Sequence, residues 1–125
     1  MAQANAMTRP KVLVVEDEAL LRTDLAWSLS EVGFDVIEVG NADDAIAVLT
    51  ATPEIRVMIT DVEMAGSMDG VKLARLVRDR WPPVHIFVVS GYHRAPELDL
   101  PSQSRFIAKP YDMRRVINAI REVLG

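Results

Sequence analysis

Four places along the chain carry side chains that could together handle a phosphoryl group or a metal ion. Glu16 and Asp17 end one apolar run, and Asp61 ends another. Ser90 and Lys109 end two further runs. A carboxylate can attack phosphorus when a nearby cation stabilises charge on the transferring oxygens. These residue types therefore indicate phosphoryl-transfer chemistry, provided that the fold brings them together.

Three carboxylates at one place require a compensating charge. Two like charges about 5 Å apart repel each other by about 3 kcal/mol at an effective dielectric constant near 20. Glu16, Asp17 and Asp61 are thus not expected to stay ionised together without a cation or a shared proton. Oxygen ligands at an open rim suit a hard divalent ion that keeps several waters, so Mg²⁺ or another divalent cation is the expected cofactor.

The elements that must position these residues alternate between two patterns. Runs rich in Val, Ile and Leu predict strands over residues 11–17, 36–39, 57–61, 85–90 and 105–109. Helical spacing predicts helices over residues 21–32, 41–49, 71–77 and 112–124. The alternation indicates an α/β fold, a doubly wound sheet of five parallel strands in the flavodoxin-like order 2-1-3-4-5. The carboxyl ends of its strands form the expected ligand-binding edge.

The segment 91–104 breaks this alternation. It contains Pro96 and Pro101, and proline inside a helix costs about 3 kcal/mol. We expect at most one or two helical turns here, so the helix between the fourth and fifth strands is degenerate.

Composition limits the remaining possibilities. The chain has 125 residues, a net charge of −4 and no cysteine, which excludes disulfides and thiolate chemistry. We expect one domain over residues 10–125 behind a flexible leader over residues 1–9. No basic cluster predicts direct nucleic-acid binding, and no apolar stretch predicts a membrane span. The expected location is cytoplasmic.

The chain resembles the receiver domain of response regulators in two-component signalling, of the CheY-like type, over residues 10–125. The matching motifs are Glu16-Asp17, Asp61, Met68-Asp69-Gly70, Ser90-Gly91 and Lys109-Pro110. Each motif alone is weak, but their shared order and spacing make the resemblance specific.

The resemblance implies a phosphorylation site with bound magnesium. Asp61 would be the phospho-acceptor. Asp17 and Asp61 would bind the metal directly, Glu16 would hold it through water, and the backbone carbonyl of Glu63 would complete the protein ligands.

The resemblance also implies residues that sense the phosphoryl group. Lys109 would bind it, and Ser90 would hydrogen-bond to it. Phe106 stands at the aromatic switch position and would change rotamer as Ser90 moves. The peptide bond before Pro110 is expected to be cis.

The chain departs from the family pattern near the site. Ala65 replaces a common proline, and Glu63 adds a fourth carboxylate that could strengthen cation binding or obstruct an attacking water. Tyr92 is bulky enough to cover the mouth of the site. No role is assigned to His85 or His93, which lack a partner at a metal-binding spacing.

The expected function is that of a single-domain response regulator. A histidine kinase or phosphotransfer protein would phosphorylate Asp61, and the domain would then change its contacts with an unidentified downstream protein. Because the chain ends at Gly125 directly after the last helix, the expected output is protein contact or a role as phosphate sink in a phosphorelay. The chain is not expected to be an enzyme beyond self-catalysed transfer and dephosphorylation at Asp61.

Three other functions are less consistent with the sequence. The sequence Asp61-Val62-Glu63 loosely resembles the nucleophile motif of haloacid-dehalogenase-like phosphatases, which have a second Asp and a longer chain. A receiver-like interaction module that works without phosphorylation is the main alternative, although the core polar positions are all filled. A nucleotide or flavin site is set aside because no glycine-rich loop follows the first strand.

Overall fold

The structure is a computed structural model that describes residues 9–64, 66, 68–91, 93, 94 and 97–125. The strands are β1 (Lys11–Val15), β2 (Asp35–Val39), β3 (Ile55–Asp61), β4 (His85–Ser90) and β5 (Arg105–Ala108). The helices are α2 (Ala19–Glu31), α3 (Ala42–Ala51), α4 (Gly70–Arg80) and α5 (Met113–Leu124). All strand pairs are parallel in the order β2-β1-β3-β4-β5, which confirms the predicted doubly wound α/β fold.

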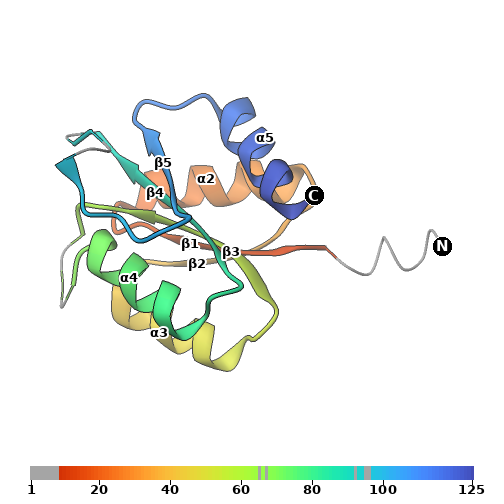
Figure 1. Ribbon diagram of the computed structural model, residues 1–125. Coiled ribbons are helices and arrows are strands. Elements are labelled where there is room, and N and C mark those ends of the chain that lie inside the picture. The colour runs from red at the N-terminus through yellow and green to blue at the C-terminus, as the bar shows by residue number, and fades with distance from the viewer. Residues whose placement is uncertain (1–8, 65, 67, 92, 95–96) are drawn as a thin grey trace.

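Two pairs of helices enclose the sheet (Figure 1). Side chains along a strand point alternately to opposite faces. Leu13 therefore packs in the cluster formed with α3 and α4, whereas Val12 and Val14 pack in the cluster formed with α2 and α5. The result is a three-layer sandwich with an apolar core on each side of the sheet.

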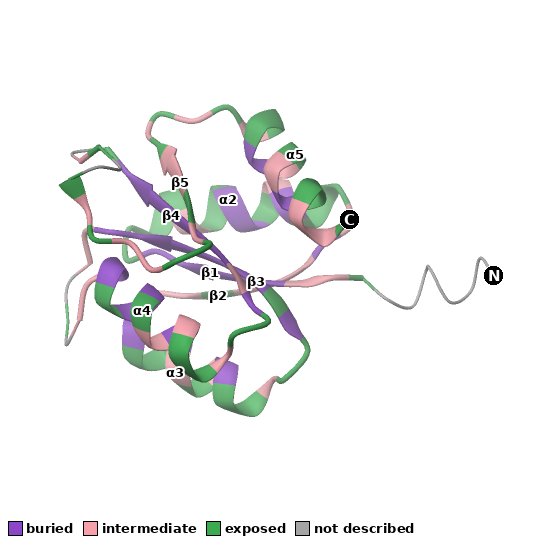
Figure 2. Ribbon diagram, viewed as in Figure 1, coloured by how far each residue is buried: buried purple, intermediate pink, exposed green. Residues whose placement is uncertain are grey.

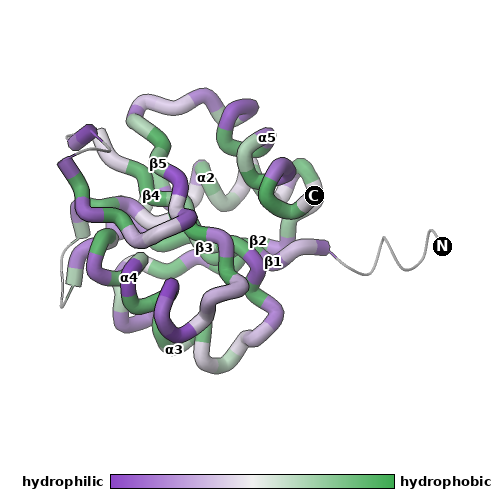
Figure 3. The backbone as a smooth tube through the Cα atoms, viewed as in Figure 1, coloured by the Kyte–Doolittle hydropathy of each residue, from purple (hydrophilic) through white to green (hydrophobic). Residues whose placement is uncertain are grey.

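The central strands are the most buried part of the molecule (Figure 2). Val12, Leu13 and Val14 of β1 are 0% exposed, as are Val57 and Met58 of β3. Hydrophobic residues are frequent along these strands, while many hydrophilic residues lie on the surrounding helices (Figure 3). Burying each such side chain contributes about 1.5–3 kcal/mol, so the strand ends stand on a rigid base. Among the helices that the structure describes, none has the length and apolar character needed to cross a bilayer.

Side-chain caps begin three of the helices. The Asn41 side chain accepts a hydrogen bond from the N–H of Asp44 at 2.8 Å and begins α3, as the sequence predicts. Asp69 caps α4 through the N–H of Lys72 at 2.9 Å. Asp112 begins α5 in the same way. These caps fix the helix starts relative to the strand ends.

The connection between β4 and β5 is irregular. Its described residues, 91, 93–94 and 97–104, contain no α-helix, which confirms that the helix expected here is degenerate. Arg75 of α4 donates hydrogen bonds to the carbonyl oxygen of Asp99 at 3.0 and 2.7 Å. Leu98 and Leu100 pack against the core. A polar anchor and two apolar side chains thus hold the segment in place of a helix.

Gly70, the first residue of α4, packs directly against the end of β3. A β-carbon at this position would lie 1.9 Å from the carbonyl oxygen of Asp61 and 3.0 Å from the α-carbon of Val62. The N–H of Gly70 also donates to the carbonyl oxygen of Val62 at 3.0 Å. Only a residue without a side chain fits here, and the backbone of Asp61 depends on it.

We therefore expect Gly70→Ala to lower the free energy of unfolding by about 1–3 kcal/mol, the usual cost of overpacking. Chemical denaturation of the two proteins measures the difference. Gly91→Ala is the matched control, because its β-carbon would lie 3.5 Å from the β-carbon of Lys109, an ordinary contact. Equal stability of Gly70→Ala and the unmodified protein would contradict the close approach.

Candidate functional site

The carboxyl ends of the central strands lie side by side at one edge of the sheet. The last residue of β1 pairs with Thr60, so Glu16 follows beside Asp61. On the other side, the carbonyl oxygen of Ser90 accepts a hydrogen bond from the N–H of Lys109 at 2.9 Å. The strand register therefore brings together the acids, the hydroxyl group and the ammonium group that the sequence singles out.

Three carboxylates meet at this edge. One oxygen each from Glu16, Asp17 and Asp61 can be chosen so that all three lie within 4.8 Å of one another. Glu16 and Asp61 are only 7% and 6% exposed, whereas Asp17 faces solvent. Two buried acids beside an exposed one form a site that opens to water on one side.

Lys109 supplies the positive charge of the cluster. Its Nζ lies 3.0 Å from Oδ1 of Asp61 and 3.4 Å from Oε1 of Glu16. Oδ1 of Asp61 is fully buried, and the described groups give it no hydrogen bond of good geometry, so Lys109 pairs with it through charge. One ammonium group serves two buried acids, which leaves this corner with excess negative charge.

Burial and repulsion by neighbouring carboxylates both raise the pKa values of the two buried acids. Burial raises the pKa of Asp61, and the charges of Glu63 and Asp17 raise it further, while Lys109 opposes the shift. Burial also raises the pKa of Glu16, with a smaller contribution from the charge of Asp61. The N–H of Glu18, which donates to Oε2 of Glu16 at 3.0 Å, offsets part of that shift. The site therefore disfavours the ionised state of its own acids.

Lys109 is held in its charged form. Burial lowers the pKa of Lys109, but its close contacts with Asp61 and Glu16 and the charges of these two acids outweigh burial, and the pKa rises overall. Lys109 is thus a fixed cation, suited to bind phosphoryl oxygens.

These features fit a hard divalent cation. The donors are carboxylate oxygens, one buried oxygen lacks a hydrogen bond, and the cluster carries excess negative charge. Asp17, Asp61 and Glu16 would hold the ion. The backbone carbonyl of Glu63 as a further ligand stays a prediction. Ala65 and Tyr92 lie outside the described residues.

Ser90 already has partners. Its hydroxyl group donates to Oε2 of Glu63 at 3.1 Å and accepts from the N–H of His93 at 3.1 Å. Nδ1 of His93 lies 2.7 Å from the same Glu63 oxygen. The sequence suggests no role for His93, although its spacing of three residues from Ser90 is one at which a hydroxyl group can meet a local N–H.

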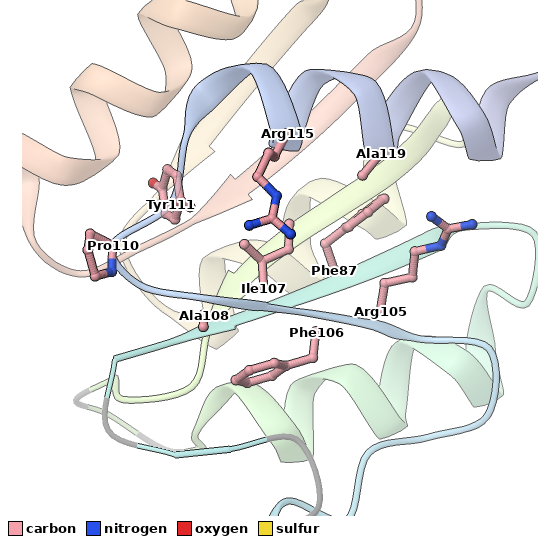
Figure 4. Close-up of a pocket in the computed structure, with 9 residues that line it drawn as sticks. All are labelled: Phe87, Arg105, Phe106, Ile107, Ala108, Pro110, Tyr111, Arg115 and Ala119. Carbon is pink, nitrogen blue, oxygen red and sulfur yellow. The ribbon is translucent and has the colours of Figure 1, made fainter.

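Phe106 lies away from the acids. It pairs with Val88 in the sheet, while Ser90 pairs with Ala108. Phe106 is half-buried and helps to line a groove of about 440 Å³, on the side of β5 opposite Arg115 of α5 (Figure 4). Its role as a switch stays a prediction.

The peptide bond between Lys109 and Pro110 is cis, as expected. Two other residues support the site although no sequence motif singles them out. Tyr111 lines a depression together with Lys109. Nη1 of Arg22 donates to the carbonyl oxygen of Glu16 at 3.0 Å. An arginine in the first turns of the helix after β1 is the one sequence signal that could have indicated this contact.

The raised pKa of Asp61 predicts how stability depends on pH. The folded protein binds this proton more tightly than the unfolded chain, so stability falls as pH rises from the ordinary carboxyl pKa through the raised one. Without divalent cations, Asp61→Asn should therefore melt at a higher temperature than the unmodified protein at neutral pH.

Thermal melts over a pH series measure this effect, and the difference should shrink as acid protonates Asp61. Glu54→Gln, which changes an exposed carboxylate at the start of β3, is the control. A destabilised Asp61→Asn at neutral pH would mean that the ion pair with Lys109 outweighs burial.

Comparison with known proteins agrees with this geometry. Residues 12–121 match the response regulator receiver domain family. The chain is 34% identical over 119 residues to the response regulator protein FleR of Pseudomonas aeruginosa, covering 92% of this chain but only 25% of FleR. It is 28% identical to the response regulator receiver protein CpdR of Brucella abortus, covering 91% of this chain and 96% of CpdR.

Solved structures show the same likeness. A response regulator receiver protein from Sinorhizobium medicae superposes with a TM-score of 0.82 at 30% identity, covering 93% of this chain and 94% of that protein. The family match, the strand order and the acid cluster with its lysine lead to one conclusion: the chain belongs to the receiver-domain family of two-component response regulators.

Proposed function

We propose that Asp61 accepts a phosphoryl group from a phosphohistidine of a histidine kinase or phosphotransfer protein, in a magnesium-dependent reaction. The observation that carries this proposal is the position of Asp61, which is buried at the end of β3 with Lys109 Nζ at 3.0 Å and two other acids within reach. An aspartate that only stabilised a turn would not require a lysine and two further carboxylates beside it.

The reaction is an in-line displacement. A carboxylate oxygen of Asp61 attacks phosphorus, the P–N bond to the donor imidazole breaks, and that nitrogen keeps the electron pair. As the negative charge of Asp61 passes to the phosphoryl oxygens, Lys109 can follow it from the carboxylate to the new anion. Ser90, at the end of the neighbouring strand, would donate its hydroxyl proton to a phosphoryl oxygen.

The acids prepare the site for its cation. Asp17 and Asp61 would bind magnesium directly, Glu16 through water, and the carbonyl of Glu63 would be a further ligand. When bound, Mg²⁺ would neutralise charge on the transferring oxygens. Burial, with a smaller contribution from repulsion between the acids, raises the pKa values of Asp61 and Glu16. A divalent ion would stabilise the ionised acids, which favours its binding.

The phosphoryl donor would approach over the start of α2. Leu20 and Leu21 are 83% and 38% exposed, and α2 begins next to Glu16 and Asp17. Leu21 lines a depression that also includes Lys109. Apolar side chains at the rim of a charged site favour contact with another protein rather than with a small molecule.

Phosphorylation would then alter contacts with a downstream protein, or the phosphoryl group would be passed onward or lost to water. The chain spans about a quarter of the length of FleR, and the proposal concerns the receiver chemistry alone. No phosphate-ester turnover is expected. A cytoplasmic location belongs to the same proposal, because phosphohistidine donors are made from ATP inside the cell.

Incubation with magnesium and a small acyl phosphate should add one phosphoryl group per chain, detected by intact mass. Chelation of the metal or the Asp61→Asn substitution should abolish the gain, because each removes a required part of the site. A folded protein that stays unmodified would instead favour a receiver-like module that works without phosphorylation.

Asp17→Asn should weaken Mg²⁺ binding by about tenfold or more, because affinity for hard cations follows the number of charged oxygen ligands. Calorimetric titration with MgCl₂ measures the change. Glu54→Gln, at the opposite end of β3, removes a charge remote from the site and should leave the affinity unchanged. Equal affinity of Asp17→Asn and the unmodified protein would contradict the metal assignment.

A further inference from the structure

Three side chains close over the hydroxyl group of Ser90 at the end of the sheet. Glu63 follows β3, Ser90 ends β4, and His93 lies in the connection after β4. Oε2 of Glu63 lies 3.1 Å from Oγ of Ser90 and 2.7 Å from Nδ1 of His93, and the same Nδ1 lies 3.2 Å from Oγ. These contacts form a closed triangle with sides of hydrogen-bond length.

The protons of this triangle can be assigned. We assign the proton between them to Nδ1 of His93, because an ionised Glu63 can only accept and would repel a lone pair on Nδ1 at 2.7 Å. The single hydroxyl proton of Ser90 then also goes to Glu63, since protonated Nδ1 has no free lone pair. The backbone N–H of His93 occupies one lone pair of Oγ at 3.1 Å.

The hydroxyl group of Ser90 is therefore already hydrogen-bonded to Glu63 and His93 before any phosphoryl group arrives. Ser90 is 1% exposed, so water does not readily replace these partners. A phosphoryl group on Asp61 would compete with Glu63 for the one hydroxyl proton. It would also place a second anion near the carboxylate of Glu63.

We propose that Glu63 and His93 form a latch that holds the hydroxyl group of Ser90 in the unphosphorylated protein, with His93 as a positioning residue that acts through Glu63. This inference rests on the proposed function, because it assumes that Ser90 donates to the phosphoryl group. The closed latch opposes phosphoryl binding, and phosphorylation opens the latch.

The latch also connects a change at Ser90 to residues outside the site. Both the backbone and the imidazole of His93 take part, so release of Ser90 frees a residue of the irregular connection after β4. His93 and Leu98 line the same depression as Glu63 and Asp17. Leu98 packs against the core next to α4. In this chain the connection, rather than a full helix, would carry the change outward.

The affinity for beryllium fluoride in the presence of magnesium tests the latch at equilibrium. This ion resembles a phosphoryl group when bound to a carboxylate, and calorimetry measures its binding. Glu63→Ala removes the carboxylate that accepts the proton of Ser90. This variant should bind beryllium fluoride about tenfold more tightly, because the fraction of protein in the latched state lowers the apparent affinity of the unmodified protein. Glu63→Gln keeps an acceptor oxygen and should stay close to the unmodified protein.

His93→Ala separates the latch from a simple charge effect. If Glu63 acts only as a negative charge near Asp61, loss of the compensating imidazole should weaken binding. The latch predicts the opposite sign, about threefold tighter binding, because Glu63 loses the partner that fixes it. In the Glu63→Ala background, His93→Ala should have no further effect, and in the Ser90→Ala background Glu63→Ala should have none.

Glu97→Ala is the matched control. Glu97 lies in the same connection, but its Oε1 accepts from the N–H of Arg94 at 2.8 Å and does not involve Ser90. Equally tight binding by Glu97→Ala would overturn the latch in favour of general loosening of the connection. Weaker binding by His93→Ala, or equal affinities of Glu63→Gln and Glu63→Ala, would overturn it in favour of charge alone.

Failure of the proposed function would look different. The unmodified protein and every variant would then show no binding of beryllium fluoride that depends on Asp61, and both proposals would fall.

Because the chain has two histidines, NMR of the imidazole nitrogens gives an independent result. Nδ1 of His93 should be protonated in the resting protein, and this state should be lost in Glu63→Ala and on adding beryllium fluoride with magnesium. Persistence of the signal in both cases would overturn the latch.

Discussion

The shortage of positive charge at one edge of the sheet governs the site. Parallel pairing of β1 with β3 places Glu16 and Asp17 beside Asp61. Among the described cations, Lys109 is the one that forms an ion pair with both buried acids. At an effective dielectric constant near 20, unit charges 4 Å apart interact with about 4 kcal/mol. A single ammonium group cannot balance this set. Burial, reinforced by this repulsion, raises the pKa values of Asp61 and Glu16, and a divalent cation or a proton relieves the excess charge.

The fold can sustain this imbalance because the strand ends cannot move apart. The residues preceding the acids are buried on both faces of the sheet, and Gly70 lets α4 press against the backbone of Asp61. Separating the acids would expose apolar surface at a cost of about 25 cal/mol per Å². The core thus holds like charges together, which keeps the edge ready for a cation and for a group that removes the charge of Asp61.

The sequence predicts those parts of the structure that follow from strand periodicity. The strand order and the meeting of Glu16, Asp61 and Lys109 follow from where apolar runs end, because parallel strands share one edge. Irregular backbone gives no such rule. His93 appears in the sequence as an isolated histidine, yet a local turn brings its N–H and its ring to Ser90. Its acceptor Glu63 lies on another connection, and no spacing in the sequence relates the two.

The irregular connection explains why Ser90 can be held in this way. A serine that precedes a helix commonly accepts a hydrogen bond from the N–H three residues later, and the N–H of His93 stands in this relation to Oγ of Ser90. Among the described residues between β4 and β5, no α-helix continues this turn, and the ring of His93 lies 2.7 Å from Oε2 of Glu63. The same three-residue step therefore places the N–H and the ring of one residue beside the hydroxyl group of Ser90 and the carboxylate of Glu63. Under the proposed latch, this contact links the proposed phosphorylation site to the connection between β4 and β5.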